Sequence, residues 1–463
     1  MNDSKAWSEK LCYTKKSVYQ CVDDKAIEAA MDYARGYTAF IDAAKTEREA
    51  VKEGIRMAKA NGFLPYQIGD ELKPGDKRYY NNRDKNLYLF TVGQKPVENG
   101  IRIAAAHVDS PRIDLKQCPL YEEGGMSFFK THYYGGIRKY QWVATPLSLH
   151  GVVVKKDGST VEISIGEDEN DPVFYINDLL PHLGHAADKK PLGEAIPAEN
   201  LNILVGSRPF DGEGESDSIK LRTLYLLHEK YGITEEDFLS AELSCVPAMK
   251  ARDVGFDRSM IAAYGHDDRV CAYPALTALF SCDTPEHTLM CVLADKEETG
   301  SDGNTGMQSD LLCDLMDAIS HALGANPAVV RRASTCLSAD VSAAFDPNFS
   351  EVFEKRNSSL LSCGVVLTKF TGSRGKSGTN DASAEYVGYL RRVMENAGVV
   401  WQAGELGRVD CGGGGTVAKY ISKHNIETVD LGVPVISMHA PYEVISKVDL
   451  YETHRAFSAF YLA

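Results

Sequence analysis

Residues 289–305 of this chain read LMCVLADKEETGSDGNT, and the expected architecture follows from this stretch. It opens with an apolar run, Leu289–Ala294, that has the length and flanks of a buried strand in a mostly parallel sheet. Two adjacent acids, Glu297 and Glu298, follow the run and precede a Gly-rich turn. Ligands of open α/β sheets bind at the carboxyl ends of the strands. There, one carboxylate could grip a cation while the other moves a proton; a solvated acidic turn is the plainer alternative.

Composition bounds the class of protein. With 463 residues the chain exceeds what one hydrophobic core normally supports, so we expect two domains. The net charge of −15 argues against nucleic acid or an anionic membrane as the main partner. No apolar stretch reaches the ~20 residues of a membrane span, and the N-terminal residues lack the apolar core of a secretory signal. The scattered cysteines, none in a C-x-x-C pair, are typical of reduced thiols in a cytoplasmic protein.

Strand and helix patterns divide the chain into two parts. A helical N-terminal segment is followed by expected strands at 86–92 and 100–108. Short β-rich runs with turn signals then fill residues 110–250, and alternating strands and helices return after them. We therefore expect an α/β fold, a three-layer α/β/α sandwich around a mostly parallel central sheet, formed by residues 1–109 and 251–463. Residues 110–250 would form an inserted smaller β-rich domain.

Five stretches share one form, in which an apolar run ends in a side chain that can bind a metal ion. They are IAAAHVDS (His107, Asp109), YGHDDRV (Asp267, Asp268), VLADKEETG (Glu297, Glu298), CLSADVS (Asp340) and VPVISMHAP (His439). If their strands lie side by side in one sheet, two imidazoles and several carboxylates converge on one edge. That mixture suits Zn²⁺, and Co²⁺ or Mn²⁺ also fit. Because the ligands exceed those of one tetrahedral site, we expect two divalent metal ions with a bridging water, ~3.5–4 Å apart.

The ordered set H-x-D, D-D, E-E, S-A-D and a late M-H resembles the aspartyl aminopeptidase, or aminopeptidase I type, family of metallo-aminopeptidases. The similarity covers essentially the whole chain and includes YGG at Tyr134–Gly136, DCGGGGT at Asp410–Thr416 and DLGVPVISMH at Asp430–His439. It implies a metallopeptidase role for the α/β/α domain and a dimerisation or oligomerisation role for residues 110–250. The family forms tetrahedral dodecamers, which implies a homo-oligomer here that admits short peptide substrates.

The resemblance also implies a set of metal ligands. His107 and Asp340 would complete one metal site. Glu298 and His439 would complete the other. Asp267 would bridge both ions, and in related families this aspartate is often followed by a cis non-proline peptide bond.

Further roles follow from the same resemblance. Glu297 would be the general base that takes a proton from the bridging water and later delivers one to the leaving amine. Asp109 would hold the His107 imidazole from behind and fix its tautomer. Many relatives carry Asn in place of Asp268, so this residue either supports the metal site or holds Arg269.

The resemblance is less definite about the groups that meet the substrate. His182 of the inserted domain would reach a neighbouring subunit's active site and steady the oxyanion, although His185 also fits, and a surface histidine is the alternative.

In aspartyl aminopeptidases a lysine near the segment that reads GVVLTKFTGSRGKSGTN here binds the acidic side chain. Lys369 is the nearest match after a one-residue shift, Thr368 takes the place without it, and Arg374 and Lys376 are rivals. In the four-glycine run, Gly413 and Gly414 would lie at the substrate pocket, where glycine permits close backbone approach.

The combined expectation is a cytoplasmic two-metal aminopeptidase that hydrolyses the N-terminal residue from peptides. The resemblance suggests a preference for Asp or Glu at the N-terminus and leaves neutral residues open. A related two-metal carboxypeptidase or N-acyl amino-acid deacylase is the nearest alternative. A non-catalytic scaffold that retains the fold is the alternative from another class.

Overall fold

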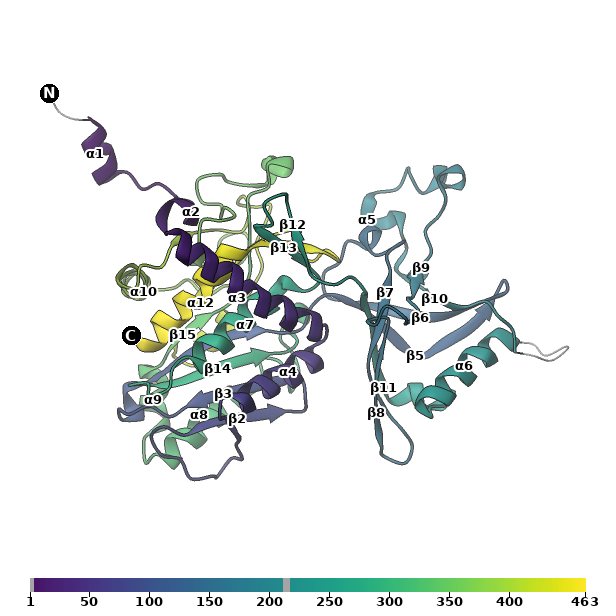
Figure 1. Cartoon of the computed structure of the whole chain (residues 1–463), viewed down its shortest axis with the longest axis horizontal. Helices are drawn as coiled ribbons and strands as arrows, with labels where there is room; N and C mark the ends of the chain where they lie inside the picture. The colour runs from purple at the N-terminus through teal and green to yellow at the C-terminus, as the bar shows by residue number, and fades with distance from the viewer. Residues whose placement is uncertain (1–3, 211–216) are drawn as a thin grey trace.

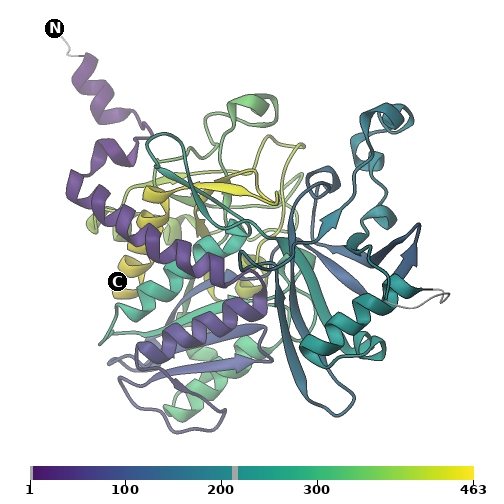
Figure 2. The ribbon, with the colours of Figure 1, turned by 45° about the vertical axis from the view of Figure 1, so that its right-hand side comes forward.

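The computed structural model describes residues 4–210 and 217–463. A large α/β part carries both ends of the chain, and a smaller β-rich part projects from one side of it (Figures 1 and 2). The N-terminal helix α1 (Ser4–Leu11) extends away from the body of the α/β part and buries none of its side chains (Figure 1).

The α/β part is built on one large sheet. Among the described residues it has the strand order β1 (Leu64–Pro65), β2 (Lys77–Asn82), β3 (Asn86–Thr91), β14 (Thr288–Ala294), β4 (Ile101–His107), β15 (Thr335–Ser338), β19 (Glu427–Gly432), β17 (Val365–Thr368) and β18 (Trp401–Ala403). The central strands β14, β4, β15 and β19 are parallel, whereas β3 and β17 run antiparallel to their inner neighbours. The sheet is therefore mixed with a parallel centre, and the strands expected at 86–92, 100–108 and 289–294 lie within it.

Helices cover both faces of this sheet, so the three-layer expectation is confirmed. The first layer contains α3 (Asp24–Ala43), α4 (Glu47–Ala60), α7 (His266–Phe280), α10 (Ala384–Asn396) and α12 (Lys447–Leu462). The opposite layer contains α8 (Leu311–Ala322), α9 (Pro327–Ala333) and α11 (Ala418–Ser422). Strand residues alternate between the layers: Cys291 and Leu293 pack with the first, and Met290 and Val292 with the second. The apolar run of β14 is continuous because both of its faces are buried.

A small additional sheet lies beside the large one and was not anticipated. Its strand order among the described residues is β12 (Arg252–Val254), β13 (Met260–Ala263), β21 (Glu443–Ser446), β20 (Pro434–Ile436) and β16 (Ser342–Ala343). Asp267 follows β13, and His439 lies between β20 and β21. The condition that the strands of all five metal-capable stretches lie in one sheet is therefore not met for these two. They reach the same place from the small sheet.

The β-rich part has its own sheet and core. In the described chain its strand order is β8 (Thr160–Ile165), β7 (Leu147–Val154), β11 (Ala241–Pro247), β5 (Arg112–Glu123), β6 (Met126–Tyr134), β10 (Ile203–Gly206) and β9 (Tyr175–Ile176). Helix α6 (Ser218–Tyr231) packs on this sheet, and Trp142, Phe129 and Phe238 fill the core. All of these strands fall within the 110–250 segment.

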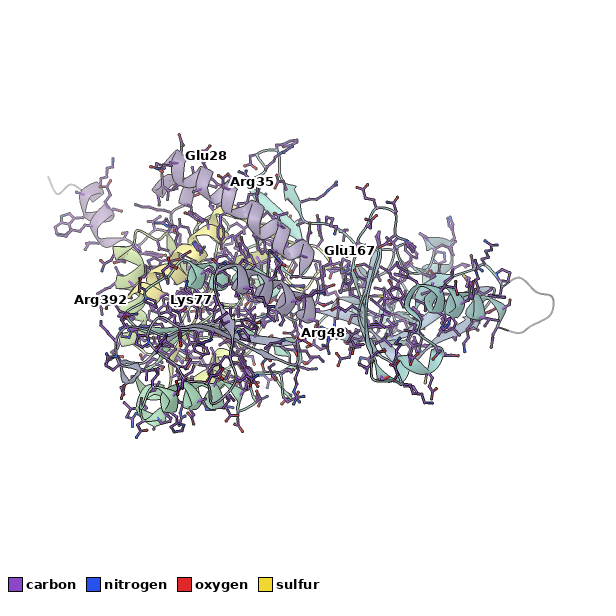
Figure 3. All side chains as sticks on the ribbon, turned by 60° about the horizontal axis from the view of Figure 1, so that its bottom comes forward. Glu28, Arg35, Arg48, Lys77, Glu167 and Arg392 are labelled. Atoms are coloured by element: carbon purple, nitrogen blue, oxygen red, sulfur yellow. The ribbon has the colours of Figure 1, made fainter. Side chains whose placement is uncertain are left out.

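Ion pairs cross the junction between the two parts. Lys45 Nζ lies 2.9 Å from Glu167 Oε1, and Arg48 Nη2 lies 2.5 Å from Glu242 Oε2. Figure 3 shows the labelled Arg48 and Glu167 at this junction. None of the helices among the described residues combines the length and apolar character that a membrane crossing requires.

Candidate metal centre

The expected metal ligands come from both sheets of the α/β part. His107 is the last residue of β4, and its register partner on β14 is Ala294, three residues before Glu297. Glu297 and Glu298 begin a short 3₁₀ turn after β14, and Asp340 follows β15 by two residues. These positions place three motif stretches at the carboxyl edge of the parallel centre, as the sequence predicts.

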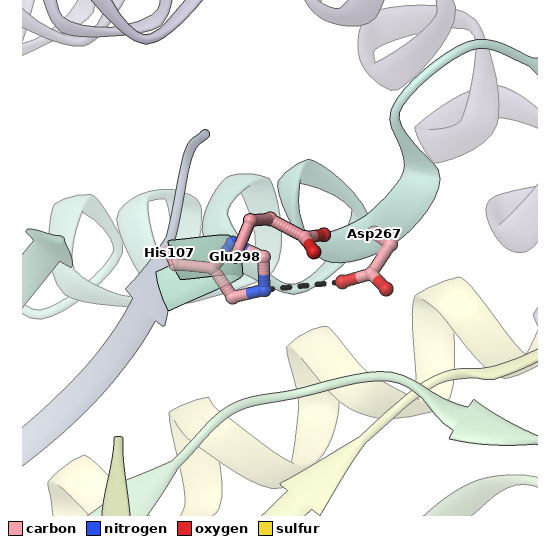
Figure 4. Close-up of side chains that lie close together, drawn as sticks. All are labelled: His107, Asp267 and Glu298. Carbon is pink, nitrogen blue, oxygen red and sulfur yellow. Dashed lines mark ion pairs between the residues drawn. The ribbon is translucent and has the colours of Figure 1, made fainter. Parts of the chain in front are cut away.

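Asp267 lies between the two histidines. Its Oδ1 is 3.1 Å from His107 Nε2, and its Oδ2 is 3.2 Å from His439 Nε2. His107 Nε2 is 4.0 Å from Asp340 Oδ1, and His439 Nε2 is 3.4 Å from Glu298 Oε1. Each oxygen of Asp267 thus faces a different histidine–carboxylate pair. Figure 4 shows His107, Asp267 and Glu298 converging, and the Asp267–Asp268 peptide bond is cis.

The donor atoms of this cluster fit a metal ion. One ligand atom each from His107, Asp267 and Glu298 lies within 4.8 Å of the others. Glu298 Oε1 is buried and has no hydrogen-bond donor among the described residues, and the buried Asp267 Oδ1 faces the His107 imidazole at 3.1 Å. Buried carboxylate oxygens without donors are costly unless a cation compensates them. Imidazole nitrogen and carboxylate oxygen together are the ligands that Zn²⁺ accepts.

The electrostatics of the cluster also favour a bound cation. Burial raises the pKa of Glu297 to about 7. Burial and the charge of Asp267 raise the pKa values of Glu298 and Asp340 well above their usual range. Burial alone would lower the pKa of His107, but hydrogen bonds to neighbouring carboxylates raise it well above 6.5. The crowded carboxylates therefore attract protons, and a divalent cation that binds here displaces them.

Asp109 supports the cluster from behind, where the sequence places it. It accepts the backbone N–H groups of Glu297 and Glu298, each over 3.1 Å, and the Tyr134 hydroxyl over 2.7 Å. Its Oδ1 lies 3.3 Å from His107 Nδ1. Burial would raise the pKa of Asp109, but the hydrogen bond and charge of His107 outweigh it and lower the pKa. The ionised carboxylate joins the His107 imidazole to the turn that carries both glutamates.

Asp268 does not hold Arg269, which was one of its two expected roles. Both Asp268 carboxylate oxygens are buried, and neither accepts a hydrogen bond from the Arg269 guanidinium. The Arg269 guanidinium donates instead to Gly265 O over 3.1 Å, to Ser110 Oγ over 2.7 Å and to Ala44 O. Ser110 Oγ in turn donates to the carbonyl of Asp267 over 2.6 Å, so Arg269 supports the cluster through a serine.

A cavity of about 420 Å³ opens beside the cluster. It is lined by Gly136, Asp267, Glu297, Glu298, Asp340, Val341, Ser342, Thr368, Thr371, Leu406, Gly413, Gly414, Gly415, Thr416, Asp430, Met438 and His439. The lining includes both expected pocket glycines, Gly413 and Gly414. Lys369 is not part of the lining, and its ammonium pairs with Asp381; Thr368, the unshifted match, lines the cavity instead.

The two histidines considered for a role in a neighbouring subunit, His182 and His185, lie away from this cavity. His182 and His185 are both exposed and belong to the 3₁₀ turn Pro181–Ala186 of the β-rich part. Neither belongs to the lining of the cavity. Within one chain, the structure therefore does not bring them to the metal centre.

Several supporting residues escaped the sequence reasoning. Glu443, at the start of β21, accepts the backbone N–H of Asp267 and of His439. Asp430 lines the cavity and accepts the Thr416 hydroxyl over 2.7 Å, and burial raises its pKa to about 7. Asp430 and Thr416 do lie in quoted motifs, DLGVPVISMH and DCGGGGT, but Glu443 has no motif signal.

Comparisons with known proteins bear on this site. Residues 40–461 match the family "Aminopeptidase I zinc metalloprotease (M18)". A "Probable M18 family aminopeptidase 1" from Clostridium acetobutylicum is 48% identical over 453 residues, which are 96% of this chain and 97% of that protein. The M18 aminopeptidase structure from Thermotoga maritima matches with a TM-score of 0.92 and 42% identity, and covers 97% of this chain and 99% of its own.

A more distant structure, the dodecamer of mApe1 from S. cerevisiae, has a TM-score of 0.75 and 21% identity, and covers 93% of this chain and 96% of its own. At that identity the likeness shows only a shared fold. The near relatives are named aminopeptidases, which favours that activity over the carboxypeptidase, deacylase and scaffold alternatives. This chain belongs to the M18 family of zinc aminopeptidases, metal-dependent hydrolases that remove the N-terminal residue from peptides.

Proposed function

We propose that this aminopeptidase works with two divalent metal ions, Zn²⁺ in the first instance and Co²⁺ or Mn²⁺ as substitutes. The observation that carries the proposal is Asp267, whose two oxygens face two different imidazoles at 3.1 and 3.2 Å. One ion would be held by His107 and Asp340, the other by Glu298 and His439. Asp267 would bridge them.

Bound metal ions would polarise the scissile carbonyl and lower the pKa of a shared water. Glu297 lines the cavity beside them and acts as the general base. Its backbone N–H is fixed on Asp109, so the side chain projects from an anchored turn. Burial raises its pKa to about 7, and a bound cation lowers that value, so the carboxylate is ionised and accepts the proton of the attacking water. The same oxygen then returns a proton to the leaving amine.

Metal stoichiometry tests this proposal. The chelated protein is reloaded with Zn²⁺, and bound zinc is measured by mass spectrometry alongside hydrolysis of a leucyl dipeptide. We expect two zinc ions per chain and activity that returns with loading. Saturation at one zinc with full activity would overturn the two-metal mechanism, and no recovery with any of the three metals would overturn the assigned centre.

We further propose that the cavity selects a neutral rather than an acidic N-terminal side chain. In the described chain, the lining contains no lysine or arginine, and Val341, Leu406 and Met438 supply apolar surface. The preference for Asp or Glu implied by resemblance needs a cation, and Lys369, the nearest one by sequence, is paired with Asp381. A panel of aminoacyl p-nitroanilides tests the choice. Faster cleavage of Leu and Met substrates than of Asp and Glu substrates supports the neutral preference. The reverse order would instead support a lysine that binds the acidic side chain.

The β-rich part, residues 110–250, is proposed as the assembly domain of a homo-oligomer, with the tetrahedral dodecamer as the expected form. Its loops and α6 expose large apolar side chains that one chain leaves uncovered: Val173, Leu179, Leu180, Leu183, Leu192, Tyr225 and Leu226. His182 lies among them and would reach the cavity of a neighbouring subunit, with His185 as the alternative. Light scattering after size-exclusion chromatography tests this: a monomer at micromolar concentration would contradict the proposal.

A further inference from the structure

The turn Tyr134–Gly136 joins the β-rich part to the metal centre. It begins at Tyr134, the last residue of β6. The Tyr134 hydroxyl donates to Asp109 Oδ2 over 2.7 Å, and the Gly136 carbonyl lies 2.8 Å from His439 Nδ1. This three-residue segment therefore contacts both Asp109, which faces the His107 ring, and the ring of His439 itself.

On the His107 side, Tyr134 completes the environment of a fully buried carboxylate. Asp109 accepts two backbone N–H groups from the turn that carries the glutamates, and it faces His107 Nδ1. The Tyr134 hydroxyl also donates to this carboxylate, and this donor comes from the β-rich part. Removing it would leave Oδ2 with one donor and would loosen the group that orients His107.

On the His439 side, the contact fixes the proton of the ring. A carbonyl oxygen can only accept, so His439 Nδ1 carries the hydrogen that Gly136 O receives. In the neutral ring Nε2 then carries no hydrogen, and this nitrogen faces Asp267 Oδ2 and Glu298 Oε1. This is the tautomer that a metal ligand requires.

The two glycines of the turn allow it to come this close. Gly135 has φ +73°, and a Cβ there would lie 3.3 Å from both Cβ and Oε2 of Glu298. A Cβ on Gly136 would lie 3.3 Å from His439 Nδ1. A side chain at either position would therefore press on a proposed metal ligand.

The turn is held against the α/β part by a buried cation. The Arg112 guanidinium stacks on the Tyr134 ring, with Cζ 4.1 Å from the ring centroid. Arg112 Nη1 donates to Glu47 Oε2 of α4 over 2.8 Å, and Nε donates to Asp114 Oδ1 over 2.8 Å. Glu47 lies in the α/β part, so the position of the tyrosine depends on how the two parts dock.

We propose that the Tyr134–Gly136 turn positions both histidines of the metal centre, so that docking of the β-rich part sets the affinity of the two metal sites. The inference rests on the proposed two-metal function. Tyr134 and Gly136 act through Asp109 and His439 and are positioning residues. Loss of either contact should weaken mainly the site on its own side.

The test is stepwise metal binding by Tyr134→Phe and Gly136→Ala, measured by chelator competition and by the visible absorption of the Co²⁺-loaded protein. Phenylalanine keeps the ring on Arg112 and removes only the hydroxyl. The matched control is Tyr133→Phe, whose ring is partly exposed on the same strand. We expect one of the two binding steps to weaken roughly 10–100-fold in Tyr134→Phe, the other step in Gly136→Ala, and neither in Tyr133→Phe.

The outcomes separate the two proposals. If Tyr134→Phe and Gly136→Ala bind both Co²⁺ ions with the affinity and spectrum of the unmodified chain, the positioning role is wrong while the two-metal function stands. If the unmodified chain shows only one binding step, the two-metal function itself is wrong. If Tyr134→Phe fails to fold, Gly136→Ala decides alone. If both Co²⁺ binding steps of Gly136→Ala are then unchanged, the inference is wrong.

Discussion

Glu443 Oε1 accepts the backbone N–H of His439 over 2.7 Å, and its Oε2 accepts that of Asp267 over 3.1 Å. One buried carboxylate therefore ties together the two ligands that come from the small sheet. Because it accepts main-chain N–H groups, it fixes the backbone positions of Asp267 and His439 rather than the orientations of their side chains.

Glu443→Ala should consequently weaken both metal binding and folding. Two buried N–H groups would lose their acceptor, at a cost of about 1–3 kcal/mol each. We expect a lower denaturation midpoint in the metal-free protein and weaker binding of zinc, measured by calorimetry and chelator competition. Glu443→Gln keeps one acceptor oxygen, so its zinc affinity and denaturation midpoint should fall between those of the unmodified protein and of Glu443→Ala. An alanine variant with unchanged zinc affinity would contradict this role.

Glu297→Gln should keep metal and assembly but lose turnover. Glutamine preserves the shape and the backbone contact with Asp109, while it cannot accept the proton of the attacking water. We expect kcat to fall by ~10²–10⁴-fold at unchanged zinc content, measured with a leucyl substrate. Near-full activity of this variant would show that another group is the base.

Asp267→Ala should lose metal rather than only activity. Its two oxygens face both histidines, so its removal takes a proposed ligand from both sites at once. Bound zinc after dialysis should fall well below that of Glu297→Gln, which serves as the matched comparison. Two retained zinc ions in Asp267→Ala would mean that this aspartate does not bridge them.

The sequence predicts the parallel centre of the sheet because both faces of β14 and β4 are buried, which makes their apolar runs continuous. It also predicts which side chains meet at the carboxyl edge. The origin of Asp267 and His439 in a second sheet could not be predicted, since β13 and β20 are short and each pairs with a strand remote in sequence, β13 with β21 and β20 with β16. Glu443 was missed for a similar reason: its role lies in accepting two main-chain groups, and a pattern of residue types does not show main-chain positions.

Stability should fall as the pH rises through the titration of His150. This buried imidazole lies between Glu49 Oε1, at 2.7 Å, and Glu167 Oε1, at 3.1 Å, and Lys45 and Lys250 also contact Glu167. Burial alone would lower the pKa of His150, but hydrogen bonds to the two glutamates raise it to about 9.

Because the folded pKa exceeds the unfolded value near 6.5, the stabilisation is complete below pH ~6.5 and is lost by about pH 9, on the order of 3 kcal/mol. Denaturation midpoints between pH 6 and 10 measure it. His150→Gln should flatten the decline in this window. An equal decline in both proteins would assign it to other groups.

Gly413 and Gly414 offer a matched pair for the wall of the cavity. Gly413 has φ +127°, and a Cβ there would lie 1.9 Å from the carbonyl oxygen of Gly372, whereas a Cβ on Gly414 would meet nothing within 4 Å. Gly372 N also donates to Gly414 O over 2.6 Å, so the two loops are joined at this point. Gly413→Ala must therefore separate them, because main-chain atoms cannot yield as a flexible side chain does. We expect a KM several-fold above that of Gly414→Ala for the same leucyl substrate, with equal zinc content in both. Equal KM values would mean that the paired loops do not shape the substrate pocket.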